Sequence, residues 1–261
     1  MAATHNPAEL AREFMDATAT GTPVDPLTTR FPDLTAEDAY GIQLAIVEQR
    51  VADGRKVIGK KIGLSGKVMQ ELLGVDEPDY GHLFDDMIVP AGEAIATDTL
   101  LAPRCEGEIA FVLADDLPGP GVTVTDVLSA TEGVMPALEI VDSRVRDWKI
   151  KLEDTVADNG SSALIVLGGA LTPVIELDLR LVGMLFSQNG KHVASGTGAE
   201  ALGHPAVSVA WLANKLAEFD VVLQAGEIVL SGSLAGAPFA APGDVFTAEF
   251  DRLGSVSVAF E

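Results

Sequence analysis

The chain has 261 residues, of which 48% are hydrophobic and 21% charged, which argues against wholesale disorder and predicts a sizeable buried core. Seventeen basic against 39 acidic residues give a formal net charge of −22, which disfavours nucleic acid and anionic membranes as partners. The single cysteine, Cys105, excludes an internal disulfide framework and a cysteine-rich metal site.

The N-terminus and the hydropathy pattern bear on targeting. Residues 1–10 carry neither the basic nor the apolar region of a signal peptide. The longest apolar run, residues 163–171, falls well short of the ~18 residues that cross a bilayer. We therefore expect a soluble, cytoplasmic protein.

The first fifty-odd residues are predicted to be helical. Residues 7–19 are rich in alanine and glutamate and place Leu10, Phe14 and Ala17 on one face. Glycine and prolines in residues 21–26 end this helix.

A second helix is predicted to begin after Thr35 and to end near Gly54. Thr35 is a good N-cap and acidic residues occupy the first turn. Behind them apolar residues recur at helical spacing, namely Tyr40, Leu44, Val47 and Val51.

From residue 57 onward short β-like runs alternate with turns. Strands are predicted at residues 109–113, 135–141 and 163–167, an antiparallel hairpin at 244–250 and 255–260, and helices after 125–126 and over 205–219. We predict an α+β fold: a helical N-terminal part, residues 1–56, leads into a mixed sheet that folds on itself, residues 57–261, as one continuous structural unit.

Two glutamates on a predicted strand form the first candidate site. Side chains at i and i+2 of a strand share a face, so Glu106 and Glu108 point the same way while Ile109 and Phe111 face the core. Like charges at this spacing repel unless a cation joins them. The alternative is an ordinary solvated strand edge.

A third glutamate lies in an apolar strand-like run. An unpaired buried charge is costly, so Glu139 needs a partner, which could be Arg144 or Arg146. Alternatively, Glu139 joins Glu106 and Glu108 as a set of hard oxygen ligands for Mg²⁺ or Mn²⁺. Three carboxylates around a dication leave a charge of −1, so a nearby cation would help to hold an anionic substrate.

A lysine pair between glycines offers that cation. Lys60 and Lys61 fall on opposite faces of a predicted strand, so one can be solvated and the other turned inward, although both could lie at the surface. The acidic turn-rich segment that follows, residues 73–82, is either a simple connection or a lid over the site. Cys105 is a poor nucleophile because the neighbouring Glu106 raises its pKa.

Taken together, these segments resemble the 2-hydroxypenta-2,4-dienoate hydratases (2-oxopent-4-enoate hydratases) of aromatic and steroid ring-cleavage pathways. These belong with the 4-oxalocrotonate decarboxylases in the fumarylacetoacetate hydrolase superfamily. The resemblance covers nearly the whole chain, and the matching segments are residues 59–65 (GKKIGLS), 73–81 (LGVDEPDYG), 106–108 (EGE), 138–144 (LEIVDSR), 147–150 (DWKI), 154–161 (DTVADNGS) and 202–205 (LGHP).

The resemblance implies a largely antiparallel β-roll with flanking helices, and it assigns roles to particular residues. It makes the three glutamates, Glu106, Glu108 and Glu139, the metal ligands. It selects Lys61 over Lys60 as a catalytic and substrate-binding residue, and it brings Asp79 and Ser161 to the same pocket. The usual Ala-Asp-Asn-Ala-Ser reads Ala-Asp-Asn-Gly-Ser here, because Gly160 replaces the second alanine.

The implied reaction adds water across the C4–C5 double bond of a 2-hydroxy-2,4-dienoate and gives a 4-hydroxy-2-oxo acid. The metal would chelate the 1-carboxylate and the 2-oxygen and withdraw electrons along the chain. A proton is delivered at C5 and water attacks C4. Lys61 would stabilise the substrate oxygens, and Asp79 would transfer the proton or position the water.

Two rival functions remain open. A sister 4-oxalocrotonate decarboxylase would use the same metal site but needs a second carboxylate pocket, for which the sequence offers no clear cation. A non-catalytic partner of a decarboxylase is disfavoured by the intact glutamates.

The resemblance and the apolar composition also predict a homo-oligomer, with Phe14 and Tyr40 either at subunit contacts or packed within the monomer. Association with neighbouring pathway enzymes stays open.

Overall fold

The structure is a computed structural model that describes residues 6–67, 70–71, 74–75, 77–90 and 92–261. The strands of one sheet, in spatial order, are β2 (Asp79–Phe84), β1 (Val57–Gly63), β9 (Ile228–Leu230), β4 (Arg104–Leu113), β5 (Thr131–Val141) and β6 (Ser162–Leu167). Those of a second sheet are β3 (Ala94–Ile95), β11 (Gly254–Phe260), β10 (Val245–Phe250), β7 (Gly183–Gln188) and β8 (Lys191–Thr197).

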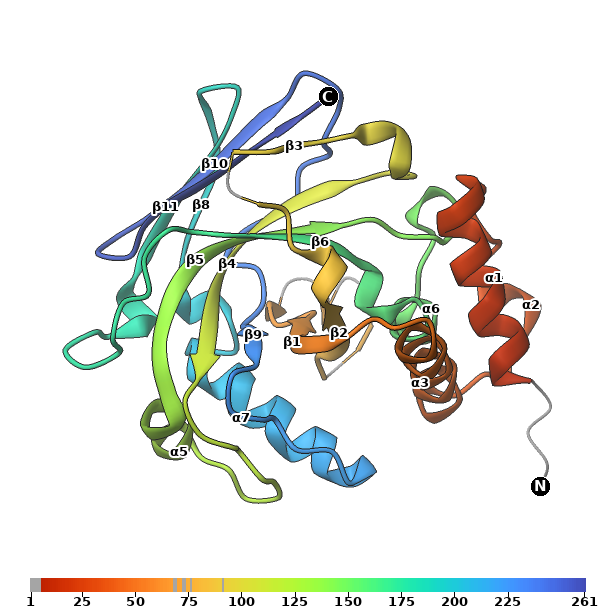
Figure 1. The fold of residues 1–261 in the computed structure, drawn as a ribbon, viewed down its shortest axis with the longest axis horizontal. Coiled ribbons are helices and arrows are strands. Elements are labelled where there is room, and N and C mark those ends of the chain that lie inside the picture. Colours follow the sequence, from red (N-terminus) through yellow and green to blue (C-terminus); the bar gives the residue numbers. More distant parts are fainter. Residues whose placement is uncertain (1–5, 68–69, 72–73, 76, 91) are drawn as a thin grey trace.

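Most strand pairs are antiparallel, and in the described chain the exceptions are β1 with β9 and β3 with β11. Strands β10 and β11 of the second sheet pack against β5 of the first, and Figure 1 shows β4 and β5 as long, curved strands. The predicted α+β fold with a largely antiparallel β-roll is therefore confirmed, including the C-terminal hairpin of β10 and β11.

The α-helices that lie wholly within the described residues are α1 (Pro7–Thr20), α2 (Leu27–Arg30), α3 (Ala36–Ala52), α5 (Val124–Ala130), α6 (Leu152–Ala157) and α7 (Pro205–Leu216). Figure 1 shows α1, α2 and α3 together on one side of the molecule, away from β10 and β11. Among the described residues, no helix is both long and apolar enough to cross a membrane. The division at residue 56 stays a prediction.

Side-chain caps explain where two helices begin. Thr35 accepts a hydrogen bond from the backbone N–H of Asp38 and Asp38 accepts one from that of Thr35, so α3 starts where predicted. The same exchange between Thr123 and Asp126 starts α5 at Val124, before the predicted position.

The predicted apolar stripe of α3 is only partly correct. Tyr40 is buried, but Val51 is 51% exposed. The buried face instead carries Ile42, Ile46 and the polar Gln43, whose amide donates to two backbone carbonyls and is therefore satisfied in the interior. Phe14 and Tyr40, the alternative subunit contacts, are both buried within the monomer.

The two faces of the first sheet differ in chemistry. Cys105, Ile109 and Phe111 of β4 join the main core, and Gly107 between them lets the second sheet approach: a Cβ there would lie 2.4 Å from the sulfur of Met184. Residues of opposite parity on β4, Arg104, Glu106, Glu108 and Ala110, face away from the second sheet. This outer face carries the candidate site.

Candidate functional site

Strand register brings three glutamates together. Glu106 of β4 lies directly opposite Glu139 of β5, and Glu108 is two residues further along the same face. One carboxylate oxygen from each of Glu106, Glu108 and Glu139 lies within 4.8 Å of the others. The solvated-edge alternative fails, because Glu108 and Glu139 are fully buried.

Buried oxygens of this cluster lack hydrogen-bond partners. Both carboxylate oxygens of Glu139 and Oε1 of Glu108 are in this state. Oε2 of Glu108 accepts from the backbone N–H of Gly232 at 2.7 Å. Unsatisfied buried carboxylate oxygens are costly unless a cation shares them, so the donor set fits a hard divalent ion.

Burial and mutual repulsion raise the pKa of two of these carboxyls. Burial, with the negative charge of Glu139, raises the pKa of Glu106 to about 7. Burial and the charges of Glu139 and Glu106 raise the pKa of Glu108 well above its usual range. Without a cation the cluster therefore resists full ionisation.

Lys61 is the cation closest to Glu139 in the described part of the chain. Its ammonium lies 3.5 Å from Oε2 of Glu139 and donates to the carbonyl of Gly160 at 3.1 Å. Burial by itself would lower the pKa of Lys61, but the surrounding carboxylates, Glu139 first, raise it above its ordinary value. Lys61 therefore stays charged inside the site.

The two arginines that were alternative partners of Glu139 form ion pairs with other carboxylates. Arg144 pairs with the buried Asp158, and Arg146 pairs with Asp25. The expectation that one lysine of the pair is solvated is also wrong: Lys60 is buried on the opposite face and donates to Glu227 at 2.7 Å.

The carboxylate of Asp79 and the ammonium of Lys61 both lie close to the backbone of Gly63. A Cβ on Gly63 would come 2.1 Å from Oδ1 of Asp79 and 2.9 Å from Nζ of Lys61. The hydroxyl of Thr155 donates to Oδ2 of Asp79, whereas the buried Oδ1 has no hydrogen-bond partner. This free oxygen is available to a water molecule or a substrate proton.

The 3₁₀ turn Asn159–Ser161 forms another wall. All three residues have positive φ, which a glycine adopts most readily, as at Gly160 (φ 61°). The Gly160 carbonyl accepts the hydrogen bond from Lys61. Ser161 is buried, and its hydroxyl donates to Asp158 at 3.0 Å. A substrate contact by Ser161 stays a prediction. In the predicted acidic lid, Leu73 and Asp76 lie outside the described residues.

A buried polar network that sequence reasoning missed lies behind this wall. Asn159 exchanges hydrogen bonds with the backbone of His82, and Nδ1 of His82 donates to Oε1 of Gln43 at 3.0 Å. Burial, with the charge of Lys60, lowers the pKa of His82 to about 3, so the ring is neutral. This network ties α3 to β2 and fixes the turn.

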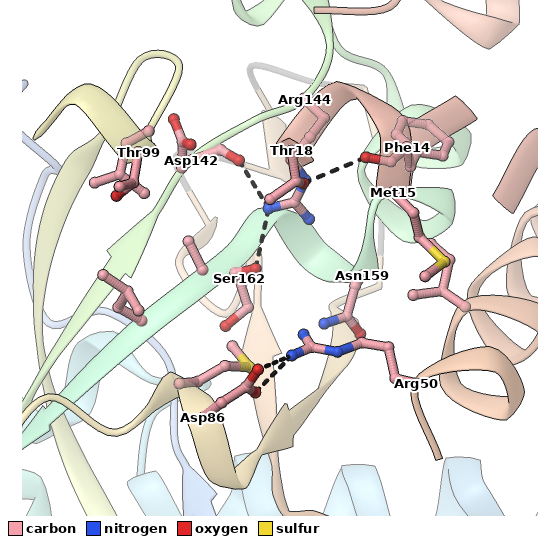
Figure 2. Close-up of a pocket in the computed structure, with 15 residues that line it drawn as sticks. Phe14, Met15, Thr18, Arg50, Asp86, Thr99, Asp142, Arg144, Asn159 and Ser162 are labelled. Atoms are coloured by element: carbon pink, nitrogen blue, oxygen red, sulfur yellow. Dashed lines mark hydrogen bonds and ion pairs between the residues drawn. The ribbon is translucent and has the colours of Figure 1, made fainter. Parts of the chain in front are cut away.

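A cavity of about 320 Å³ lies behind the same turn and does not include the three glutamates (Figure 2). Arg144 donates there to the carbonyls of Asp142 and Ser162, and Arg50 donates to Asp86. Each charged side chain that lines this cavity already has a partner, so we place the candidate site at the glutamates.

With this geometry established, comparison with known proteins gives the family. Residues 66–260 match the fumarylacetoacetate (FAA) hydrolase C-terminal family, and the chain belongs to it. It is 50% identical to 2-hydroxyhexa-2,4-dienoate hydratase of Comamonas testosteroni, over 90% of each chain. It is 51% identical to 2-hydroxypent-2,4-dienoate hydratase of Pseudomonas putida, over 82% of this chain and 96% of that one.

A solved structure shares the whole architecture. The 4-oxalocrotonate decarboxylase from Pseudomonas putida G7, complexed with magnesium and adipate, is 38% identical, covers 98% of this chain and 97% of its own, and superposes with a TM-score of 0.95. The expected family is therefore confirmed.

Proposed function

We propose that this protein is a divalent-metal-dependent hydratase. It adds water to 2-hydroxypenta-2,4-dienoate, or to a substituted analogue, and gives the 4-hydroxy-2-oxo acid. The observation that supports this most is the cluster of Glu106, Glu108 and Glu139, in which three buried carboxylate oxygens, both of Glu139 and Oε1 of Glu108, lack hydrogen-bond partners. The similarity to two dienoate hydratases at 50% and 51% identity supports the reaction type.

The three glutamates would hold the metal, and we infer Mg²⁺ or Mn²⁺ from their hard oxygen donors. A cation bound there supplies a Lewis acid for the substrate's 1-carboxylate and 2-oxygen. Lys61 is charged and buried beside Glu139, so it binds and neutralises the same end of the substrate.

Asp79 is the candidate for moving the proton. Oδ2 is held by Thr155, which fixes the carboxylate and leaves Oδ1 free to accept a proton from water or to deliver one at C5. Water then adds at C4. Ser161 completes the proposed pocket as a substrate contact.

The rival activity is decarboxylation of 4-oxalocrotonate, which the structural similarity to a decarboxylase supports. Incubating the purified protein with Mg²⁺ and each substrate in turn separates the two. The proposal expects loss of dienoate absorbance with formation of 4-hydroxy-2-oxopentanoate. Release of CO₂ from 4-oxalocrotonate without hydration of the dienoate would replace it with the rival.

We also infer that the protein assembles as a homo-oligomer. Three apolar side chains of the second sheet are exposed: Leu185 on β7 (56%), Val193 on β8 (43%) and Val245 at the start of β10 (41%). A subunit contact would bury this apolar surface. Light scattering that returns the mass of one chain would refute assembly.

A further inference from the structure

An arginine continues the row of glutamates on β4. Side chains two residues apart on a strand share a face, so Arg104 follows Glu106 and Glu108 on the outer face of the sheet. Glu108 is fully buried, whereas Glu106 and Arg104 are partly exposed. The row therefore runs from the interior of the site to its surface, and Arg104 stands at the outer end.

Two aromatic rings hold the guanidinium of Arg104. It lies 3.9 Å from the ring centroid of Phe239 and 4.9 Å from that of Trp148. The indole of Trp148 is itself fixed, because its N–H donates to the carbonyl of Ala102 at 2.9 Å. Cation–π contacts of this kind orient the planar group without using its N–H donors.

Those donors are largely free. Among the described residues, the side chain of Arg104 makes one hydrogen bond, a long one of 3.3 Å to the carbonyl of Ala237, and its buried Nε has no partner. By contrast, Arg144 and Arg50 are each paired with a carboxylate. An oriented arginine fork with unused donors matches the two oxygens of a carboxylate.

The site therefore has a cation at each end. Lys61 lies at the inner end beside Glu139, and Arg104 lies at the outer end, two strand residues or about 6.8 Å beyond Glu106. We propose that Arg104 binds the distal carboxylate of a dicarboxylic dienoate, so that the site prefers dianionic substrates over the unsubstituted acid. This inference rests on the proposed function and assigns it a substrate class.

The test compares two substrates on matched variants. Rates are measured with Mg²⁺ for 2-hydroxyhepta-2,4-diene-1,7-dioate and for 2-hydroxypenta-2,4-dienoate, using wild type, Arg104→Met, Arg104→Lys and Lys149→Met. Methionine keeps an unbranched side chain against Phe239 and Trp148, and thermal unfolding verifies that each variant folds. Lys149 is an exposed neighbour that pairs only with Asp147 among described residues, so its variant controls for general loss of positive charge.

We expect wild type to favour the dioate in kcat/KM. Arg104→Met should lower the dioate-to-monoacid ratio by about tenfold to a hundredfold, the value of a charge-assisted pair. Arg104→Lys should retain part of the preference, and Lys149→Met should leave the ratio as in wild type. Equal losses on both substrates in Arg104→Met, or a wild type that turns over the monoacid alone, would overturn the inference.

A binding measurement separates this inference from the proposed function. If neither dienoate is turned over, the proposed function fails, and calorimetric titration with hexanedioate and hexanoate in the presence of Mg²⁺ decides the inference alone. Tighter binding of hexanedioate that disappears in Arg104→Met supports it. Equal binding of the two acids by wild type refutes it.

Discussion

Replacing Glu106 by glutamine should stabilise the metal-free protein at alkaline pH. Burial and the charge of Glu139 raise the pKa of Glu106 from 4.5 to about 7. A carboxyl whose pKa is higher in the folded state lowers the free energy of unfolding as the pH rises from 4.5 to 7, because the unfolded chain releases the proton first. The difference corresponds to roughly 3 kcal/mol at pH 8, and Glu106→Gln removes this cost.

Thermal unfolding in EDTA measures the effect. For a chain of this size, 3 kcal/mol corresponds to an increase in Tm of about 6–12 °C at pH 8, and the gain should vanish near pH 4.5. Glu132→Gln is the matched control, since Glu132 is an exposed glutamate on the same strand as Glu139. With saturating Mg²⁺ the order should reverse, because only wild type keeps all three ligands. A Glu106→Gln protein that is less stable than wild type in EDTA at pH 8 would refute the reasoning.

Three further predictions concern Lys61, His82 and Gly63. Lys61→Met should lower kcat/KM by about a hundredfold or more, whereas Lys60→Met should cost far less activity per folded molecule; equal losses would contradict the assignment. Because the pKa of His82 falls from 6.5 to about 3 on folding, the free energy of unfolding of wild type relative to His82→Gln, measured by urea titration, should fall by roughly 2–3 kcal/mol between pH 7 and 4.5. Gly63→Ala should abolish turnover in a folded protein, because its Cβ would displace Asp79 and Lys61; near-normal rates would show that their positions do not matter.

Much of the fold follows from local signals in the sequence. The Thr35 cap and the alternation of the C-terminal hairpin are local, and α3, β10 and β11 appear where predicted. The stripe of α3 could not be predicted fully, because Gln43 is buried by hydrogen bonds to carbonyls of β2 and α6, which are remote in the sequence.

The parts of the candidate site that depend on contacts remote in the sequence could not be predicted either. Strand periodicity alone put Glu106 and Glu108 on one face, but their approach to Glu139 depends on the β4–β5 register. The burial of Lys60 could not be foreseen, because its partner Glu227 is 167 residues away. No pattern in the sequence singled out Arg104, because Phe239 and Trp148 contact it only through tertiary packing.

The most direct test of the central claim is turnover of 2-hydroxypenta-2,4-dienoate by chelator-stripped protein during titration with Mg²⁺. We predict no activity without metal, full recovery in wild type as one ion per chain is bound, and recovery lower by orders of magnitude in Glu139→Gln, which lacks a ligand. Full activity in excess EDTA, or equal recovery in wild type and Glu139→Gln, would contradict the assignment of the glutamate cluster as a catalytic metal site.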